Sequence, residues 1–180
     1  RERHELKSAP FRDGEYWFNW SIYIPEDYPV IYPVKVALGQ FHQEGSHPVW
    51  MFQNGKGGYI VDNQVYGSTL QREQILSDAQ MRGKWSDILL HVNFSAKKDG
   101  FFKVYVNGES APSYSWEGKT KKPGYQVYYK VGIYRSFISR GEGEAATQVV
   151  YYDDIARGSS CEEVARYFDC AAIAAQSANQ

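Results

Sequence analysis

The sequence predicts an all-β fold, a β-jelly roll of two antiparallel sheets with one short C-terminal helix. Apolar and polar residues alternate with a period of two in several segments, and turn signals separate those segments. Only one stretch has helical periodicity, so a sandwich or jelly roll is the architecture expected. At 180 residues the chain is long enough for one core, and we expect one domain spanning residues 1–180.

Strand signals are dense in the first half of the chain. The alternation in Tyr16–Ile24 places Phe18 and Trp20 on one face, and Trp17 and Asn19 on the other. The Asn54-Gly55 dipeptide is typical of a hairpin turn. The expected strands are Arg1–Leu6, Tyr16–Ile24, Val34–His42, Val49–Gln53 and Gly58–Asn63.

The second half begins with an irregular stretch, Ser68–Arg82, for which a short helix and a long loop both remain open. Trp85–Phe94 then alternates cleanly, and the Asp99-Gly100 turn leads into the next strand. Residues 110–124 are rich in Ser, Lys, Gly and Pro and predict a basic loop. The expected strands of this half are Trp85–Phe94, Phe101–Asn107, Tyr125–Ile138 and Gln148–Ile155.

The predicted helix starts at Ser160, which with Glu163 matches a capping box, and Val164 begins its apolar stripe. The Ala-rich tail, Ala171–Gln180, is expected to be loosely held. Cys161 and Cys170 lie near this helix, and one short-loop disulfide and two free thiols are both open alternatives.

Composition excludes several classes of function. The net charge of −1 gives no overall field that would attract nucleic acid or an anionic polymer, so an anionic ligand requires a local cluster of cations. No apolar run is long enough to span a bilayer. The chain begins at Arg1 in strand-like sequence, and we expect that an N-terminal strand or signal region is missing.

Two predicted strands collect polar side chains on one face. The period of two places Gln40 and His42 together, and it places Tyr128, Lys130 and Tyr134 together. Gly132 lies between Lys130 and Tyr134, where it predicts a gap for the close approach of a ligand.

The N-terminal segment adds cations to this set of side chains. Arg1 and Arg3 share one face with Glu5, whereas alternation places His4 on the opposite face. Each segment alone is more typical of an ordinary sheet surface. Together they supply an amide, an imidazole, a guanidinium, an ammonium and a phenol.

This set fits elimination at a uronic acid. Removing the C5 proton drives charge into the adjacent carboxylate, which cations and hydrogen-bond donors stabilise as an oxyanion hole does. A base must take the proton and an acid must protonate the departing O4. A tyrosine performs both steps if nearby cations lower its pKa from about 10.

The same residues resemble a known family. Arg3-His4-Glu5-Leu6 resembles the R-[ST]-E-L segment of jelly-roll alginate lyases, and Gln40-Phe41-His42 resembles their Q-[IV]-H segment. Residues 128–134 resemble their Y-F-K-A-G-x-Y segment. The longer context, including residues 38–42, 83–87, 99–108 and 130–135, is similar to the glucuronan lyase and heparin lyase group, and the resemblance extends from Arg1 to about Val164.

The resemblance implies an enzyme, a polysaccharide lyase with specific site residues. It implies that Tyr134 is base and acid, that Gln40 and His42 hold the carboxylate or assist proton transfer, and that Arg3 pairs with the substrate acid. His4 replaces the usual small hydroxyl residue, so it is either a second imidazole of the site or a residue packed on the other face, as alternation favours. The expected substrate-binding residues are Lys130, Arg1, His4, Tyr128, Trp17 and Asn19.

Two other functions remain open. One is a non-catalytic carbohydrate-binding module or lectin, which the aromatic content of 16% suits. The other is a glycoside hydrolase on the same fold, which needs two carboxylates across the bond. No E-x-D-x-E strand provides them, because Glu142-Gly143-Glu144 lies in a Gly-rich turn.

The expected partner is an anionic polysaccharide such as glucuronan, bound by a secreted monomer that contacts neither nucleic acid nor membrane. The chain lacks a strongly basic groove of the kind that a heavily sulfated polymer requires. We expect no cofactor in catalysis. For Asp153-Asp154, a structural calcium site and a surface acidic pair are the two alternatives, and the metal content is unknown.

Overall fold

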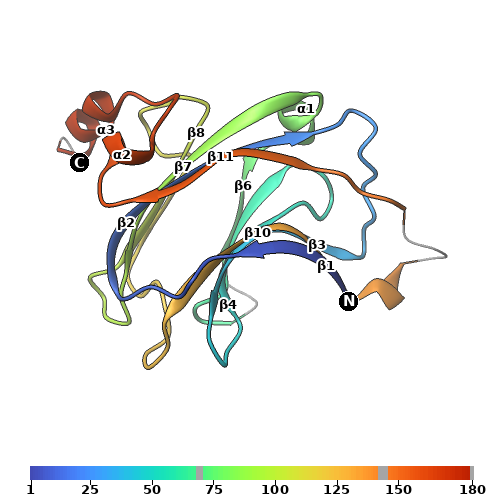
Figure 1. Cartoon of the computed structure of the whole chain (residues 1–180), viewed down its shortest axis with the longest axis horizontal. Helices are drawn as coiled ribbons and strands as arrows, with labels where there is room; N and C mark the ends of the chain where they lie inside the picture. The colour runs from blue at the N-terminus through green and yellow to red at the C-terminus, as the bar shows by residue number, and fades with distance from the viewer. Residues whose placement is uncertain (68–70, 142–145, 179–180) are drawn as a thin grey trace. The chain divides into compact units, whose positions relative to one another are not determined.

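The computed structural model describes residues 1–67, 71–141 and 146–178, and most of the regular structure in them is antiparallel β (Figure 1). Contacts between Cα atoms divide the chain into two compact units, which are described separately below. Unit 1 comprises residues 1–12, 23–84 and 121–151, and unit 2 comprises residues 13–22, 85–120 and 152–180.

Unit 1 contains a six-stranded sheet in the order β1-β10-β3-β4-β5-β6. The segments β1 and β10 come from opposite halves of the chain and lie side by side (Figure 1). The strands are β1 (Glu2–Lys7), β3 (Lys35–Gln43), β4 (Pro48–Gln53), β5 (Tyr59–Asn63), β6 (Gln71–Leu76) and β10 (Val127–Ser136). Unit 1 also contains α1 (Asp78–Met81) and the 3₁₀ turn η1 (Ile138–Arg140).

The two faces of this sheet differ in polarity, as the alternation predicts. One face packs large apolar side chains that are fully buried, including Phe41, Trp50, Phe52 and Tyr59. The hairpin of β4 and β5 forms as expected, with Trp50 paired to Asn63 and Gln53 to Ile60. The opposite face carries Gln40, His42 and the other polar residues of the candidate site.

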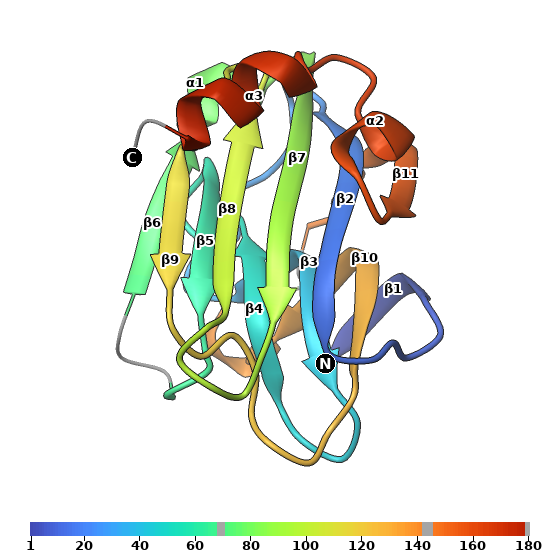
Figure 2. The same ribbon diagram turned by 90° about the vertical axis from the view of Figure 1, so that its left-hand side faces the viewer.

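Unit 2 forms most of a five-stranded sheet in the order β11-β2-β7-β8-β9. Figure 2 shows β2, β7, β8 and β9 as neighbours, with the C-terminal helices near one end of these strands. The strands are β2 (Gly14–Ile24), β7 (Lys84–Phe94), β8 (Phe101–Val106), β9 (Tyr114–Glu117) and β11 (Tyr151–Gly158).

The C-terminal segment differs from the prediction. The expected helix is only the single turn α2 (Cys161–Val164). Ser160 forms no side-chain cap, and Glu163 accepts hydrogen bonds from Ser159. The tail, expected to be loosely held, forms the helix α3 (Cys170–Ser177).

Packing explains this second helix. A disulfide joins Cys161 to Cys170, which settles the alternative that the sequence left open. The two helices pack on the Trp17 face of unit 2, where Leu89 and Ile173 belong to the same buried cluster. The apolar contacts and the crosslink together hold a segment whose composition alone predicts little order.

Two strands were not predicted. β6 and α1 occupy part of the stretch Ser68–Arg82, of which residues 68–70 lie outside the described residues. The predicted basic loop contains β9, which pairs with β8 at the edge of its sheet. Both β6 and β9 are edge strands, which bury few apolar side chains. The alternation of apolar and polar residues in their sequences is therefore weak. The Glu142-Gly143-Glu144 turn also lies outside the described residues.

Candidate active site

A trough on the polar face of the six-stranded sheet brings the predicted side chains together. Six predicted site residues line it: Arg1, Arg3, Gln40, His42, Lys130 and Tyr134. Further lining residues include Lys35, His47, Met51, Gln64, Ser136 and Phe137. All of these residues belong to unit 1.

Strand register creates this grouping. Arg3 of β1 is the direct partner of Tyr134 of β10. Across the next pair of strands, Lys130 is the partner of Gln40, and Tyr128 is the partner of His42. Side chains of directly paired residues project from the same face, and neighbouring strands are about 4.8 Å apart, so three distant segments supply one site.

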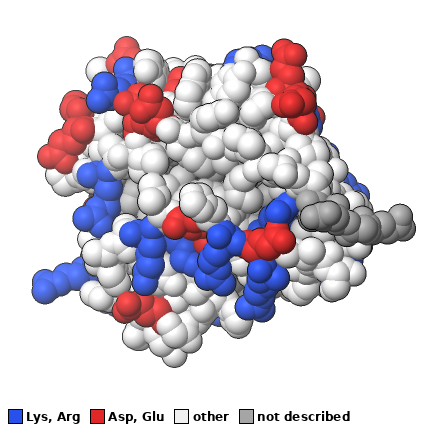
Figure 3. Space-filling view, turned by 45° about the vertical axis from the view of Figure 1, so that its right-hand side comes forward, with Lys and Arg blue, Asp and Glu red and all other residues white. Residues whose placement is uncertain are grey.

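The trough is locally basic although the chain is not. Its described lining includes the cations Arg1, Arg3, Lys35 and Lys130 and no carboxylate. Lys and Arg side chains gather in a band on the face drawn in Figure 3, with acidic side chains between some of them. A chain of net charge −1 therefore has the local cation cluster that an anionic ligand requires.

A buried carboxylate that is not part of the trough lining contacts two residues that are. The side chain of Glu5, 5% exposed, accepts a hydrogen bond from Nε2 of Gln40 at its Oε1 atom. Its Oε2 atom lies 3.6 Å from Nζ of Lys130. One carboxylate thus holds two of the predicted site residues and offsets part of the positive charge.

Glu5 was not predicted as a site residue. Its position beside Arg3 in the R-[ST]-E-L-like segment, and its place on the Arg1 and Arg3 face, were the available signals. They could not show that register brings Glu5 into contact with Gln40, which lies 35 residues away in sequence.

Tyr134 is partly exposed in the trough, and the guanidinium of Arg3 lies over its ring, 5.2 Å from the ring centroid. The expectation for Gly132 was wrong, because the space beside it is filled by β1 and does not admit a ligand. A Cβ atom at Gly132 would lie 2.2 Å from the carbonyl oxygen of His4, and φ at Gly132 is +133°. Glycine is required here so that β1 can approach β10 closely.

His42 has a defined protonation pattern. Its Nδ1 atom lies 2.8 Å from the carbonyl oxygen of Gln43. Because a carbonyl can only accept, Nδ1 carries the hydrogen, and in the neutral ring Nε2 is then the acceptor. Burial lowers the pKa of His42, and the nearby Lys130, His47 and Lys7 lower it further, while the bond to Gln43 opposes the shift.

We predict that His42 titrates below its ordinary pKa of about 6.5, as NMR of the ring protons would measure. The folded-state pKa is depressed, so the neutral ring stabilises the fold above pH 6.5, and this contribution is lost as the pH falls through the folded-state pKa. His42→Ala assigns the resonance. Titration at or above 6.5 would contradict the neutral imidazole.

Tyr128 lies beneath the polar surface rather than on it. Its ring stacks on His42 with centroids 5.2 Å apart, and Nζ of Lys7 lies 4.1 Å from its centroid. Burial raises the pKa of Tyr128, and the charges of Glu44 and Glu5 add to the effect while Arg3 opposes it. Tyr128 therefore remains a neutral phenol that supports His42.

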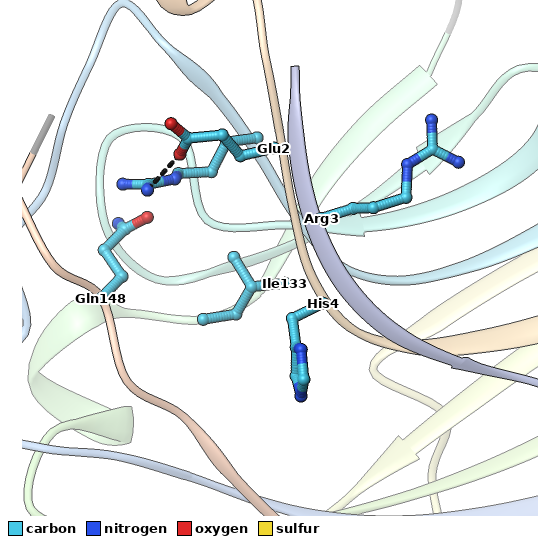
Figure 4. A pocket seen from close by; sticks show the side chains of 6 residues that line it. Glu2, Arg3, His4, Ile133 and Gln148 are labelled. Carbon is cyan, nitrogen blue, oxygen red and sulfur yellow. Dashed lines mark ion pairs between the residues drawn. The ribbon is translucent and has the colours of Figure 1, made fainter.

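His4 lies on the face of β1 opposite Arg3, as alternation predicts (Figure 4). There it is exposed, and it lines a small separate pocket with Ile133 and Gln148. An ion pair between Glu2 and Arg135 borders the same pocket (Figure 4). The structure thus supports the second alternative for His4, a residue of the other face.

Trp17 and Asn19 belong to unit 2, and both side chains are buried there. Trp17, 8% exposed, stacks on His91 with centroids 3.8 Å apart, and it packs in the cluster beneath the C-terminal helices. Asn19 donates through Nδ2 to the carbonyl oxygen of Asp154. A buried indole presents no face to a sugar, so neither residue enters the proposal below.

Both carboxylates of the Asp153-Asp154 pair have partners within the chain. Asp154 is ion-paired with Nε of Arg166 at 2.8 Å, and Asp153 accepts from the backbone N–H of Asp154. Within the described part of the chain, no group of three or more His, Cys, Asp or Glu side chains is arranged to hold a metal ion. No described helix is long and apolar enough to cross a membrane.

Comparison with solved structures shows the fold. The endo-β-1,4-glucuronan lyase of the fungus Trichoderma reesei matches with a TM-score of 0.72 at 16% identity, over 90% of this chain and 76% of that one. An alginate lyase of Pseudomonas aeruginosa matches with a TM-score of 0.57 at 14% identity, over 88% of this chain and 74% of that one. The fold is the mostly β fold of the jelly-roll lyases, with antiparallel sheets of six and five strands.

The fold and the basic trough fit one class of enzyme, the polysaccharide lyases. Residues 1–156 match the model of the family described as polysaccharide lyase. The chain belongs to this polysaccharide lyase family. No curated protein matches the chain.

Proposed function

We propose that the chain cleaves a glucuronan-like polymer by β-elimination in the trough, with Tyr134 as base and acid. The observation that carries the proposal is the pairing of Arg3 with Tyr134 and of Lys130 with Gln40 on one polar face. The likeness to a glucuronan lyase supports this choice of polymer. A trough whose described lining has four cations suits carboxylates rather than dense sulfate.

Substrate binding comes first in the proposed sequence. Arg3 pairs with the uronate carboxylate, and Gln40 donates to it through the amide hydrogen that Glu5 does not use. These contacts strengthen as charge moves into the carboxylate, so they stabilise the enolate-like intermediate more than the bound substrate. The hydrogen bond from Gln40 to Glu5 fixes the amide orientation before the substrate arrives.

Proton transfer follows at Tyr134. Its phenolate takes the C5 proton, the C4–O4 bond breaks as the C4–C5 double bond forms, and the resulting phenol returns the proton to O4. Of the two roles expected for His42, we assign it assistance in proton transfer and not contact with the carboxylate. In the neutral ring Nε2 is an acceptor, so it takes up a proton and does not donate a hydrogen bond. The Arg3 guanidinium lies over the ring of Tyr134, beside both proton transfers.

The disulfide between Cys161 and Cys170 supports a secreted enzyme, because such bonds persist in oxidising compartments. A secreted enzyme meets its polymer outside the cell.

The test is a panel of glucuronan, alginate, pectate, ulvan and heparin, assayed for ultraviolet absorbance of the new double bond and for reducing ends. We expect glucuronan to be cleaved fastest, with one double bond for each new reducing end. Reducing ends without absorbance would indicate a hydrolase. Binding without either product would indicate a carbohydrate-binding module.

A further inference from the structure

A second polar cluster lies on the same face of the sheet, and its centre is two strands from Gln40. We call it the distal cluster, and it consists of Lys35, Gln53, Asp62, Gln64 and Arg72. Lys35 and Gln64 line the trough, so the same hollow that holds Gln40 and Tyr134 reaches the distal cluster. None of these five residues has a role in the elimination described above.

Register connects the two clusters in one row across the sheet. Gln40 of β3 pairs with Met51 of β4, Met51 pairs with Asp62 of β5, and Asp62 pairs with Arg72 of β6. Asp62 is thus two strands from Gln40, which corresponds to about 10 Å. A polymer that crosses the strands from the cut bond therefore meets the distal cluster with a neighbouring sugar.

Asp62 is the centre of this cluster, and other members of the cluster supply its hydrogen bonds. Its side chain is 1% exposed and accepts from Nε2 of Gln53, from Nε2 of Gln64 at 2.7 Å, and from Nε of Arg72 at 3.1 Å. The Arg72 side chain is 56% exposed, and the contact of its Nε atom with Asp62 fixes its orientation. An arginine held in this way is preorganised for a carboxylate.

Lys35 adds a positive charge that the cluster does not neutralise. Asp62 carries one negative charge, whereas Lys35 and Arg72 carry one positive charge each. Among the described residues, no carboxylate forms an ion pair with Lys35. Burial lowers the pKa of Lys35, with Asp62 opposing the shift and Arg72 adding to it. A half-buried ammonium is costly unless an anion meets it.

We propose that Lys35 and Arg72 form a second carboxylate-binding position, which holds a uronate residue of the polymer other than the one that is cut. The proposal rests on the proposed function, since it assumes that the same polymer lies in the trough. Asp62 and Gln64 position the two cations and the polymer chain. Because this position holds a uronate other than the one that is cut, it contributes to binding and not to the chemical step.

The test measures binding of glucuronan oligosaccharides of increasing length by calorimetry, in the inactive Tyr134→Phe background. Lys35→Met should weaken the binding of long oligosaccharides about tenfold, as expected for the loss of one charge-assisted hydrogen bond. A single glucuronate, which occupies only the position of the uronate that is cut, should bind equally well to both proteins. In the active enzyme, KM should rise by the same factor and kcat should not change.

Three controls separate binding from folding. Lys35→Arg keeps the charge and should retain most of the affinity. Lys98→Met removes an exposed lysine of unit 2 and should bind like its parent. The thermal unfolding temperature of Lys35→Met should not fall, because the replacement removes a half-buried charge.

The outcomes distinguish this inference from the proposed function. If the enzyme forms unsaturated product normally and Lys35→Met binds every length like its parent, the second position is refuted and elimination stands. If no uronan yields unsaturated product but Lys35→Met still weakens the binding of long oligosaccharides, elimination is refuted and the second position stands.

Discussion

Replacing Tyr134 with phenylalanine is expected to lower kcat on a uronan by about 10²–10⁴-fold, the range for the loss of general acid–base catalysis. The variant keeps the ring over which Arg3 lies, 5.2 Å from its centroid, and removes only the hydroxyl group. Both proton transfers depend on that oxygen, whereas the cations that hold the polymer are untouched. The initial rate of absorbance increase measures the effect.

The affinity of Tyr134→Phe for the polymer serves as the control. Binding should equal that of the unmodified enzyme, because Arg3, Gln40 and Lys130 remain in place. A variant that keeps full activity would remove Tyr134 from the mechanism. A variant that loses binding and activity in parallel would make Tyr134 a binding residue.

Gln40→Ala is the second change with a large expected effect. Loss of a donor that stabilises an oxyanion costs about 3 kcal/mol, or about 100-fold in kcat. The same change leaves the buried Glu5 with Lys130 alone, so a small loss of stability is also expected. Steady-state kinetics measure the first effect and thermal unfolding the second. Gln126→Ala, at an exposed position, is the matched control.

The contact between Glu5 and Gln40 allows a second test, which asks whether Glu5 positions the Gln40 amide. Glu5→Gln should lower kcat by loosening the amide, and adding it to Gln40→Ala should cost less than the two separate effects combined. Strictly additive effects would show that Glu5 does not position Gln40. A normal rate for Gln40→Ala itself would reject its role in stabilising charge.

The central strands could be predicted from the sequence because packing leaves a clear pattern. Trp85–Phe94 alternates because Ile88, Leu90, Val92 and Phe94 are all fully buried, and the structure forms β7 at Lys84–Phe94. Edge strands leave less trace, so β6 and β9 were missed. The C-terminal helix α3 was missed because its order comes from tertiary contacts and the disulfide rather than from its own sequence.

The candidate site could be predicted in part, for a related reason. Alternation within one strand placed Gln40 with His42, and Lys130 with Tyr134, and the trough contains all four side chains. Pairing between strands is not visible in one sequence, so neither the Glu5 contact nor the row from Gln40 to Arg72 was foreseen. Gly132 was correctly noted as special, but the group that approaches it is the β1 backbone.

The resemblance to a known family indicated the class of enzyme, which the periodicity of the sequence could not. Short motifs in the right order indicated a polysaccharide lyase, and the family match over residues 1–156 confirms this. The expectation that Trp17 and Asn19 contact the substrate is not supported, because both side chains are buried in unit 2. Alternation cannot distinguish an open polar face from one that a C-terminal helix covers.

The most direct measurement is a crystal structure of the Tyr134→Phe variant with a bound glucuronan oligosaccharide. The account predicts one uronate carboxylate in contact with Arg3 and Gln40, with its C5 hydrogen facing the ring at position 134. An oligosaccharide bound on another surface, or one whose carboxylate points away from Arg3 and Gln40, would contradict it.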